Sequence, residues 1–323
     1  MGEKNQGVGL GLDIGGTNIA GALVDAAGRL LEQYTLPTCA RKGQDAVIEQ
    51  IFLVAEHLFR QAENKGLQIR GIGMGVPGPL ESRTGLVLHA PNLGWHNVPV
   101  KQIVQQRFQT PVFVENDVRC AALGEKYFGA GRGVDDLICV ALGTGVGAGI
   151  FVAGSLLRGF GDIAGEIGHI CLDPNGPHCN CGRRGCLEVY AGAPGIARRA
   201  REAIQSGKQS VIGKLVGGNL ALIDPAVISS AAGQGDQLAI EIWRETGELV
   251  GWALATAVTL FNPRLVIVGG GVARAGEVLL GSIRETVFQR AMPEHARQVE
   301  VVPAHLGERA GVVGAACLVL EKI

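Results

Sequence analysis

The stretch Leu12-Asp13-Ile14-Gly15-Gly16-Thr17-Asn18 decides the fold, because a similar stretch returns in the second half of the chain. It places a glycine–threonine turn between two short apolar runs, Val8–Ile14 and Ile19–Val24, which are typical of strands. The stretch Leu142-Gly143-Thr144-Gly145 repeats this arrangement, with Gly149–Val152 as the run that follows. Each then reaches a second turn that ends in two leucines. We interpret the two as one supersecondary unit used twice; the alternative is a chance similarity of glycine-rich hairpins.

The rest of the chain alternates short apolar runs with helical spacing, which is typical of α/β proteins. Its 323 residues suggest about two domains. Apolar residues recur at helical spacing over residues 44–63 and 236–261, and buried strands are expected at Ile69–Val76 and Leu265–Val268. A final helix over 309–321 is expected to return and pack on the first half.

The composition excludes several classes of protein. Hydrophobic residues make up 47%, charged residues 18% and aromatic residues 5%, which is not the profile of a disordered, fibrous or coiled-coil chain. The 50 glycines, roughly twice the usual share, indicate tight turns and close backbone approaches. The formal charge of −1 provides no basic field to hold a phosphate backbone, so we expect no nucleic-acid partner.

The mean hydropathy of +0.24 raises the question of a membrane span. The uncharged run Leu137–Leu157 is long enough, since ~20 residues suffice. Glycine at every second position from Gly143 to Gly149 breaks a helix, however, so strands are favoured and no membrane is expected. Glu3 and Asp13 lie around the first short apolar stretch, unlike a signal peptide. We therefore expect a soluble, cytoplasmic protein.

Two glycine motifs resemble a dinucleotide-binding fingerprint but lack its context. Gly73–Gly78 fits G-x-G-x-x-G and Gly143–Ala148 fits G-x-G-x-x-A. The fingerprint needs its last glycine to open a helix that faces the pyrophosphate. Pro79 and a turn follow the first match, and a strand follows the second. The chain also has no G-x-x-x-x-G-K-[ST] motif, which excludes a P-loop.

The pair of glycine–threonine turns is predicted to bind the phosphates of ATP. Consecutive glycines expose backbone N–H groups as an anion-binding nest, and threonine and asparagine add donors. Asp13 is a candidate ligand of Mg²⁺, directly or through water. Either turn alone fits an ordinary hairpin, but their joint occurrence favours a polyphosphate site. The candidate nucleotide-binding residues are Gly15, Gly16, Thr17 and Asn18 in the first turn, Gly143, Thr144 and Gly145 in the second, and Gly270 and Gly271 after a buried strand, where adenosine would lie against bare backbone.

Three of the eight cysteines, Cys179, Cys181 and Cys186, are close together in the sequence and read as metal ligands. Tetrahedral Zn²⁺ takes three or four such donors, whereas exposed clustered thiols would oxidise. The fourth ligand is His169, Cys171 or His178. His178 is disfavoured because it adjoins Cys179 and adjacent side chains usually diverge. We favour His169 over Cys171, because His169 stands ten positions before Cys179, enough for an intervening loop.

Four protein ligands leave no open position, so the predicted metal is structural. The remaining cysteines, Cys39, Cys120, Cys139 and Cys317, are in apolar runs and are expected to be inert core residues.

Several motifs follow one another in the order found in the ROK family of sugar kinases. They are Leu12-Asp13-Ile14-Gly15-Gly16-Thr17-Asn18, Ala90-Pro91-Asn92-Leu93-Gly94-Trp95, Glu115-Asn116-Asp117, Leu142-Gly143-Thr144-Gly145-Val146-Gly147, and Gly165-Glu166-Ile167-Gly168-His169 followed by the cysteine segment to Glu188. The chain therefore resembles this family over nearly its whole length, and within it the bacterial ATP-dependent glucokinases. The resemblance implies a duplicated actin-like, ribonuclease H-like α/β fold with an interdomain active-site cleft. It implies a small α/β domain of residues 1–116 plus 306–323 and a large one of residues 117–305.

The resemblance also implies the site and its reaction, the ATP-dependent phosphorylation of the 6-hydroxyl of glucose. Asp117 is similar to the family's general base for that hydroxyl. The family's zinc-binding residues match His169, Cys179, Cys181 and Cys186 of this chain, in agreement with the choice made from spacing. ATP, Mg²⁺ and a structural Zn²⁺ are the implied cofactors, and a homodimer or homotetramer is expected. The implied sugar-binding residues are Gly78, Asn92, Asn116, Asp117, Glu166, His169 and Glu188.

Simple chemistry agrees with these roles. Asp117 closes a strand at the start of a predicted helix, where a carboxylate stays ionised; a plain helix cap is the alternative. Glu166 and Glu188 bracket the metal segment, so zinc would hold both carboxylates rigidly. His169 can bind zinc through one ring nitrogen and a sugar hydroxyl through the other.

Other functions stay open. Related kinases act on N-acetylmannosamine, N-acetylglucosamine, fructose or allose, and the choice of glucose rests on the resemblance alone. The family also contains non-catalytic sugar-binding regulators, including repressors with a helix-turn-helix ahead of the kinase-like part. We expect no helix-turn-helix here, because the first phosphate turn starts at residue 13, and a non-catalytic sugar sensor would not need Asp117. A chaperone-type ATPase of the same superfold would lack the cysteine cluster.

Overall fold

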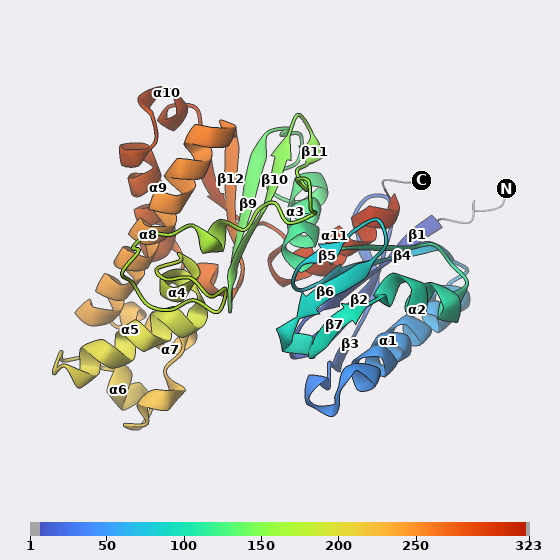
Figure 1. Cartoon of the computed structure of the whole chain (residues 1–323), viewed down its shortest axis with the longest axis horizontal. Helices are drawn as coiled ribbons and strands as arrows, with labels where there is room; N and C mark the ends of the chain where they lie inside the picture. The colour runs from blue at the N-terminus through green and yellow to red at the C-terminus, as the bar shows by residue number, and fades with distance from the viewer. Residues whose placement is uncertain (1–6, 321–323) are drawn as a thin grey trace. The chain divides into compact units, whose positions relative to one another are not determined.

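The computed structural model describes residues 7–320 as a mixed α/β protein (Figure 1). The strands are β1 (Gly7–Ile14), β2 (Asn18–Val24), β3 (Leu30–Pro37), β4 (Gln68–Val76), β5 (Leu80–Glu81), β6 (Leu86–Ala90), β7 (Trp95–Val98), β8 (Val112–Asn116), β9 (Leu137–Leu142), β10 (Val146–Val152), β11 (Ser155–Leu156), β12 (Leu265–Gly269) and β13 (Glu300–Pro303). The α-helices are α1 (Gln44–Asn64), α2 (Val100–Phe108), α3 (Asp117–Phe128), α4 (Glu188–Ala191), α5 (Ala193–Gln205), α6 (Ile212–Leu215), α7 (Pro225–Gly233), α8 (Gln237–Phe261), α9 (Glu277–Arg290), α10 (Pro293–Ala296) and α11 (Ala310–Leu320).

The two main sheets have the same strand order, which confirms that one unit is used twice. The first runs β3-β2-β1-β4-β8 and the second β11-β10-β9-β12-β13. In each, three consecutive strands extend to one edge, and two later strands add in parallel on the other side. The glycine–threonine turn therefore follows the central strand of both sheets, β1 in one and β9 in the other.

The described residues form two compact units. The first holds residues 7–135, 149–165 and 305–320, and the second holds 136–148 and 166–304. These units keep α3 with the first sheet, whereas the domains expected from the sequence divide before residue 117. That domain division stays a prediction.

Strand β1 explains why this chain needs glycine at the centre of a sheet. Its apolar residues, such as Leu10 and Leu12, point to one face and join the core of the first unit with α1. Of the alternate residues, Gly9 and Gly11 face α11. A Cβ on Gly11 would lie 2.1 Å from the carbonyl oxygen of Val312. Only a glycine face lets the helix approach this closely.

Helix α11 returns to the first unit, as the sequence predicted. It packs on β1, β4 and α3, and Figure 1 shows it in red beside the blue strands. Residues 310–319 are all buried. Residue 321 and the Glu3 stretch, on which the expectation about a signal peptide rests, lie outside the described residues.

The sequence did not predict β3 or the three-stranded sheet β5-β6-β7. Strand β3 is an edge strand whose residues are exposed or half-buried, so it has no continuous apolar run. Strand β5 is only two residues long, too short to leave a pattern.

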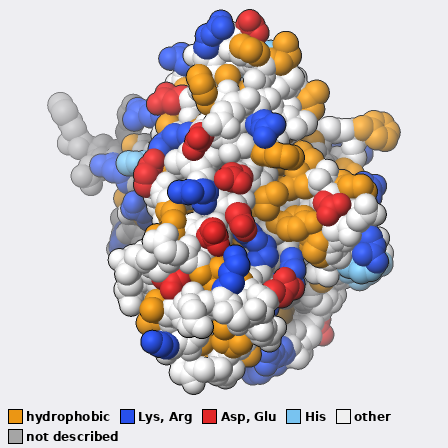
Figure 2. Space-filling view, turned by 90° about the vertical axis from the view of Figure 1, so that its left-hand side faces the viewer, with side chains coloured by type: hydrophobic (Ala, Val, Ile, Leu, Met, Phe, Trp, Pro, Cys, Tyr) orange, Lys and Arg blue, Asp and Glu red, His pale blue; other side chains and the backbone are white. Residues whose placement is uncertain are grey.

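Two surface properties complete the description. No helix within residues 7–320 combines the length and apolar character that a membrane crossing needs. Figure 2 shows acidic and basic side chains interspersed over the face that it draws, in keeping with the near-zero formal charge.

Candidate functional site

The first glycine–threonine turn is a fixed loop with an exposed tip. The Gly15 N–H donates to the Asn18 carbonyl at 2.9 Å, which closes the turn. The Thr38 hydroxyl donates to the Gly15 carbonyl at 2.6 Å. Gly16, Thr17 and Asn18 are exposed, so their polar groups remain accessible on a rigid backbone.

Asp13, near the end of β1, lies in an unfavourable place for a charge. Its carboxylate is packed on α11, since a Cβ on Gly311 would be 2.2 Å from its Oδ2. Burial, and secondarily the negative charge of Asp117, raise the pKa of Asp13 to about 7. A divalent cation would relieve both effects, so the paired carboxylates fit the Mg²⁺ role expected of Asp13.

The corner between β8 and α3 presents Asn116 and Asp117. Asn116 is the N-cap of α3, and its side-chain oxygen accepts the N–H groups of Val118 and Arg119 at 3.0 and 3.2 Å. Asp117 is the first helical residue, and its Oδ1 also accepts the Val118 N–H at 2.9 Å. The Asn116 amide donates to the Gly78 carbonyl at 3.5 Å. The corner thus holds both predicted residues in fixed positions.

The first unit therefore brings together part of the predicted sugar set. Gly78 lies beside Asn116 through the contact just given, and it has a left-handed φ of 88°. Asn92 lies against the first glycine–threonine turn, because a Cβ on Gly16 would be 3.1 Å from the Asn92 Cβ. Asn92 is exposed, as a ligand-binding amide would be.

The second unit places Glu188 against the second turn. The Gly143 N–H donates to the Gly145 carbonyl at 2.9 Å. Glu188 Oε2 accepts the Val146 N–H at 3.0 Å, and a Cβ on Gly145 would lie 2.6 Å from the same oxygen. Gly270, with a φ of 87°, adjoins the end of β9, where a Cβ would be 2.3 Å from the Leu142 carbonyl. Turn, carboxylate and glycine cluster are therefore neighbours, while Gly271 has open space around its Cα.

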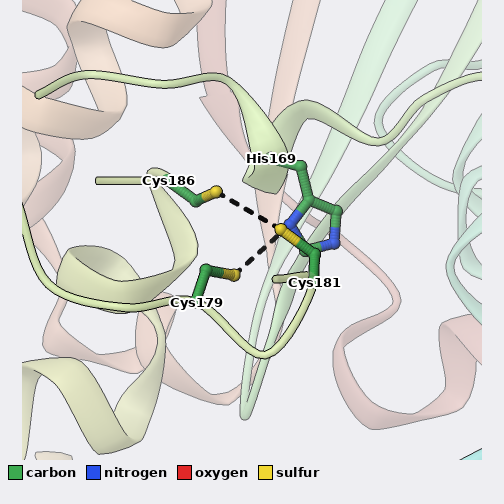
Figure 3. A group of neighbouring side chains, drawn as sticks. All are labelled: His169, Cys179, Cys181 and Cys186. Atoms are coloured by element: carbon green, nitrogen blue, oxygen red, sulfur yellow. Dashed lines mark hydrogen bonds between the residues drawn. The ribbon is translucent and has the colours of Figure 1, made fainter. Parts of the chain in front are cut away.

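The four predicted metal ligands form one cluster (Figure 3). The donor atoms of His169, Cys179, Cys181 and Cys186 all lie within 4.8 Å of one another. His169 Nδ1 is 3.7 Å from the Cys179 sulfur, and the sulfurs of Cys181 and Cys186 are 3.6 Å apart. Three thiols and one imidazole at this spacing fit four-coordinate zinc.

The two other candidates for the fourth ligand are engaged elsewhere. The Cys171 thiol is exposed and donates to the Arg184 carbonyl at 3.5 Å, and the His178 Nε2 lies 2.6 Å from the Arg184 guanidinium. Neither belongs to the cluster.

The thiols of the cluster have shifted acidities. Burial raises the pKa of Cys186 to about 12 and also raises that of Cys179. A backbone hydrogen bond with Arg183 lowers the pKa of the exposed Cys181. Burial therefore disfavours the thiolate form of Cys179 and Cys186.

The imidazole of His169 connects this cluster to a carboxylate. Its Nε2 lies 3.7 Å from an oxygen of Glu166, while its Nδ1 points at Cys179. The two ring nitrogens thus face two different sets of groups. A metal on one side would fix the ring that the other side presents.

One prediction about the remaining cysteines is wrong. Cys120, Cys139 and Cys317 are buried, as expected of core residues. Cys39 is only half-buried; it is the N-cap of a short 3₁₀ turn, with a left-handed φ of 58°.

Sequence reasoning quoted Glu115 as part of a motif but assigned it no role. Glu115 is fully buried and forms ion pairs with Arg119 at 2.8 Å and Arg158 at 2.7 Å. The only sequence signal was a carboxylate inside an otherwise apolar strand, which needs a partner when buried.

Comparisons with known proteins agree with these observations. The glucokinase of Thermotoga maritima is 40% identical over 315 residues, which cover 97% of this chain and 98% of that protein. The xylose repressor of Caldicellulosiruptor bescii is 33% identical over 322 residues, which cover 99% of this chain and 80% of the repressor.

A crystal structure is similar over the same extent. The ROK family glucokinase from Streptomyces griseus, in complex with glucose and AMPPNP, matches with a TM-score of 0.85 and 38% identity, over 96% of this chain and 98% of that one. The fold is accordingly the duplicated, actin-like two-domain α/β fold expected from the sequence. The family model for ROK matches residues 9–322, and the chain belongs to the ROK family.

Proposed function

We propose that this protein is an ATP- and Mg²⁺-dependent hexokinase that phosphorylates the 6-hydroxyl of glucose. The β8–α3 corner carries the proposal, because Asn116 caps the helix and Asp117 follows it beside the second carboxylate, Asp13. The similarity to glucokinases from Thermotoga maritima and Streptomyces griseus supports glucose as the acceptor.

In the proposed reaction Asp117 is the general base. Its carboxylate accepts the proton of the sugar's 6-hydroxyl while that oxygen attacks the γ-phosphorus of ATP, and the bond to the β-phosphate oxygen breaks to release ADP. Asp117 is half-buried at a helix N-terminus, a position that favours its ionised form. Phosphoryl transfer otherwise depends on positioning and on neutralising charge.

Sugar binding is assigned to the residues expected from the sequence. Gly78, Asn92 and Asn116 offer a carbonyl and amides, and hydroxyl groups pair with such groups in either direction. The second unit supplies Glu166, His169 and Glu188.

The nucleotide is assigned to the two turns. Backbone N–H groups of Gly15, Gly16, Gly143 and Gly145, with the side chains of Thr17, Asn18 and Thr144, would hold the phosphates. Gly270 and Gly271 would leave room for adenosine against the backbone.

Two metals complete the proposal. Asp13 would hold Mg²⁺, which neutralises phosphate charge when bound. His169, Cys179, Cys181 and Cys186 would hold one structural Zn²⁺, which leaves no open position for chemistry. This zinc would fix the ring of His169 and, through the segment between them, Glu166 and Glu188.

A sugar panel tests the acceptor. ADP release is measured with glucose, N-acetylmannosamine, N-acetylglucosamine, fructose and allose, and the product of the best substrate is identified by oxidation with a glucose-6-phosphate dehydrogenase. We expect the highest kcat/KM with glucose. A kcat/KM at least tenfold higher with another sugar would show that the protein is a sugar kinase but that glucose is not its substrate.

A non-catalytic sugar-binding regulator is the second candidate, favoured by the 33% identity to a xylose repressor. A regulator would bind sugar without turning over ATP. Sugar binding by calorimetry together with no ADP release would favour it over the kinase.

We also propose a homodimer or homotetramer in the cytoplasm. The large apolar side chains of Leu260 and Phe288 are 72% and 67% exposed, and a subunit interface would cover such groups. Light scattering of the purified protein measures the mass directly.

A further inference from the structure

The buried carboxylate of Glu115 is shared between two arginines. Its Oε1 lies 2.8 Å from Arg119 Nη2, and its Oε2 lies 2.7 Å from Arg158 Nε. Glu115 has no solvent exposure, so its charge depends on these two partners.

The same carboxylate holds the backbone on both sides of Asp117. The Asn116 N–H donates to Glu115 Oε1 at 2.9 Å. Arg119, its ion-pair partner, is in the first turn of α3, two residues beyond Asp117. Asp117 is therefore presented by a short piece of backbone that one carboxylate fixes before and after it.

Arg158 is the one member of this group that comes from another part of the chain. It opens a loop that the Ala164 N–H closes by donating to the Arg158 carbonyl at 3.0 Å. The other side of the loop is fixed where Asp162 accepts the N–H and hydroxyl of Ser82 at 2.9 and 3.1 Å. Arg158 is thus held in place by its own loop, and its side chain is 40% exposed.

Arg119 has two hydrogen-bond donors without a partner within the described part of the chain. Its Nε and Nη1 are buried and have no hydrogen-bond partner among residues 7–320. Without the ion pair to Arg158, the Glu115 carboxylate would be free to rotate toward these two nitrogens of Arg119. Such a rotation would draw Oε1 away from the Asn116 N–H, so Arg158 keeps the carboxylate in the position that the corner needs.

We propose that Arg158 is a positioning residue for phosphoryl transfer, which acts through Glu115 to fix the backbone that presents Asp117. This inference rests on the proposed role of Asp117 as general base. A displacement of about 1 Å at a reacting group can cost about 10²-fold in rate. The residues proposed to hold the phosphates of ATP, in the two glycine–threonine turns, lie outside this corner.

The experiment compares Arg158→Met, Arg158→Lys and the control Arg60→Met in the full-length protein. Arg60 is an exposed arginine of α1 whose side chain has no ion pair or hydrogen bond among the described residues. We measure kcat, KM for glucose and ATP, thermal unfolding, and amide hydrogen exchange over residues 115–120. Arg158 is partly exposed, so both of its variants should remain folded.

We expect Arg158→Met to lower kcat about 10²-fold, with KM for ATP within twofold of wild type, and to speed exchange at Asn116, whose N–H donates to Glu115. Arg158→Lys should have a kcat at least tenfold above that of Arg158→Met. Arg60→Met should match the wild type in kcat, KM, thermal unfolding and amide exchange. Wild-type kcat in Arg158→Met, or a raised KM for glucose with kcat and exchange unchanged, would overturn the inference. If the wild-type protein has no sugar-dependent activity, the proposed function fails, and the exchange data still decide whether Arg158 fixes the corner.

Discussion

The side-chain oxygen of Asn116 accepts the backbone N–H of Arg119 at 3.2 Å, which makes Asn116 the N-cap of α3. The neighbouring Asp117 occupies the first helical position instead. The sequence left open whether Asp117 serves only as a helix cap. Because Asn116 satisfies two N–H groups of the first turn, the helix start does not depend on a charge at Asp117.

Asp117→Asn should separate catalysis from structure. The amide keeps the shape and hydrogen-bonding capacity of the carboxylate but cannot accept the 6-hydroxyl proton. We expect kcat to fall about 10²–10⁴-fold, with glucose affinity and unfolding temperature close to wild type. Turnover within tenfold of wild type would show that Asp117 is not the base.

Asn116→Ala should affect both stability and sugar binding. Loss of a cap costs about 1 kcal/mol of unfolding free energy, which urea titration can measure. Asp224→Ala is the matched control, since Asp224 caps α7 by accepting the Val227 N–H at 2.8 Å. Both variants should be destabilised, and only Asn116→Ala should raise KM for glucose. An unchanged KM would remove Asn116 from the sugar set.

Cys179→Ser should abolish zinc binding, measured as metal per chain by elemental analysis. Cys171→Ser is the control, because its thiol lies outside the cluster. We expect near one zinc per chain in wild type and in the control. The loop-rich segment from His169 to Glu188 then loses its shape without metal, so glucose affinity and kcat should fall while ATP still binds. Full activity after complete metal removal would contradict this.

Asp13 should make stability depend on pH in the metal- and nucleotide-free protein. Its pKa rises from 3.8 to about 7 on folding, so the folded state binds the proton more tightly than the unfolded state. The resulting destabilisation is complete above pH 7 and fades as the pH falls toward 4. Asp13→Asn should therefore raise the unfolding temperature at pH 8, and by less at pH 5. An equal effect at both values would refute the shift.

Local motifs predicted the parts of the fold and site that depend on neighbouring residues. The repeated glycine–threonine turn predicted that one supersecondary unit is used twice, because a turn and its flanking strands are encoded together, and the two sheets of equal strand order confirm it. The cysteine spacing predicted the Cys₃His cluster, since a tight loop brings such side chains together.

The rest depends on tertiary contacts that leave no local pattern. The Glu115–Arg158 pair joins residues 43 positions apart, and many arginines could have met that carboxylate. Glycine is required at position 11 because α11 approaches β1 closely there. The sequence alone did not show which helix would lie against Gly11.

The central claim is that this protein transfers phosphate from ATP to a sugar, so that it releases ADP only when the sugar is present. The direct measurement is ADP release by the purified protein with Mg²⁺ and ATP, with and without glucose, run beside Asp117→Asn. We predict release that requires glucose, equals the glucose 6-phosphate formed, and falls at least 10²-fold in the variant. Equal ADP release with and without glucose would contradict the account, because the protein would then be an ATPase and not a sugar kinase.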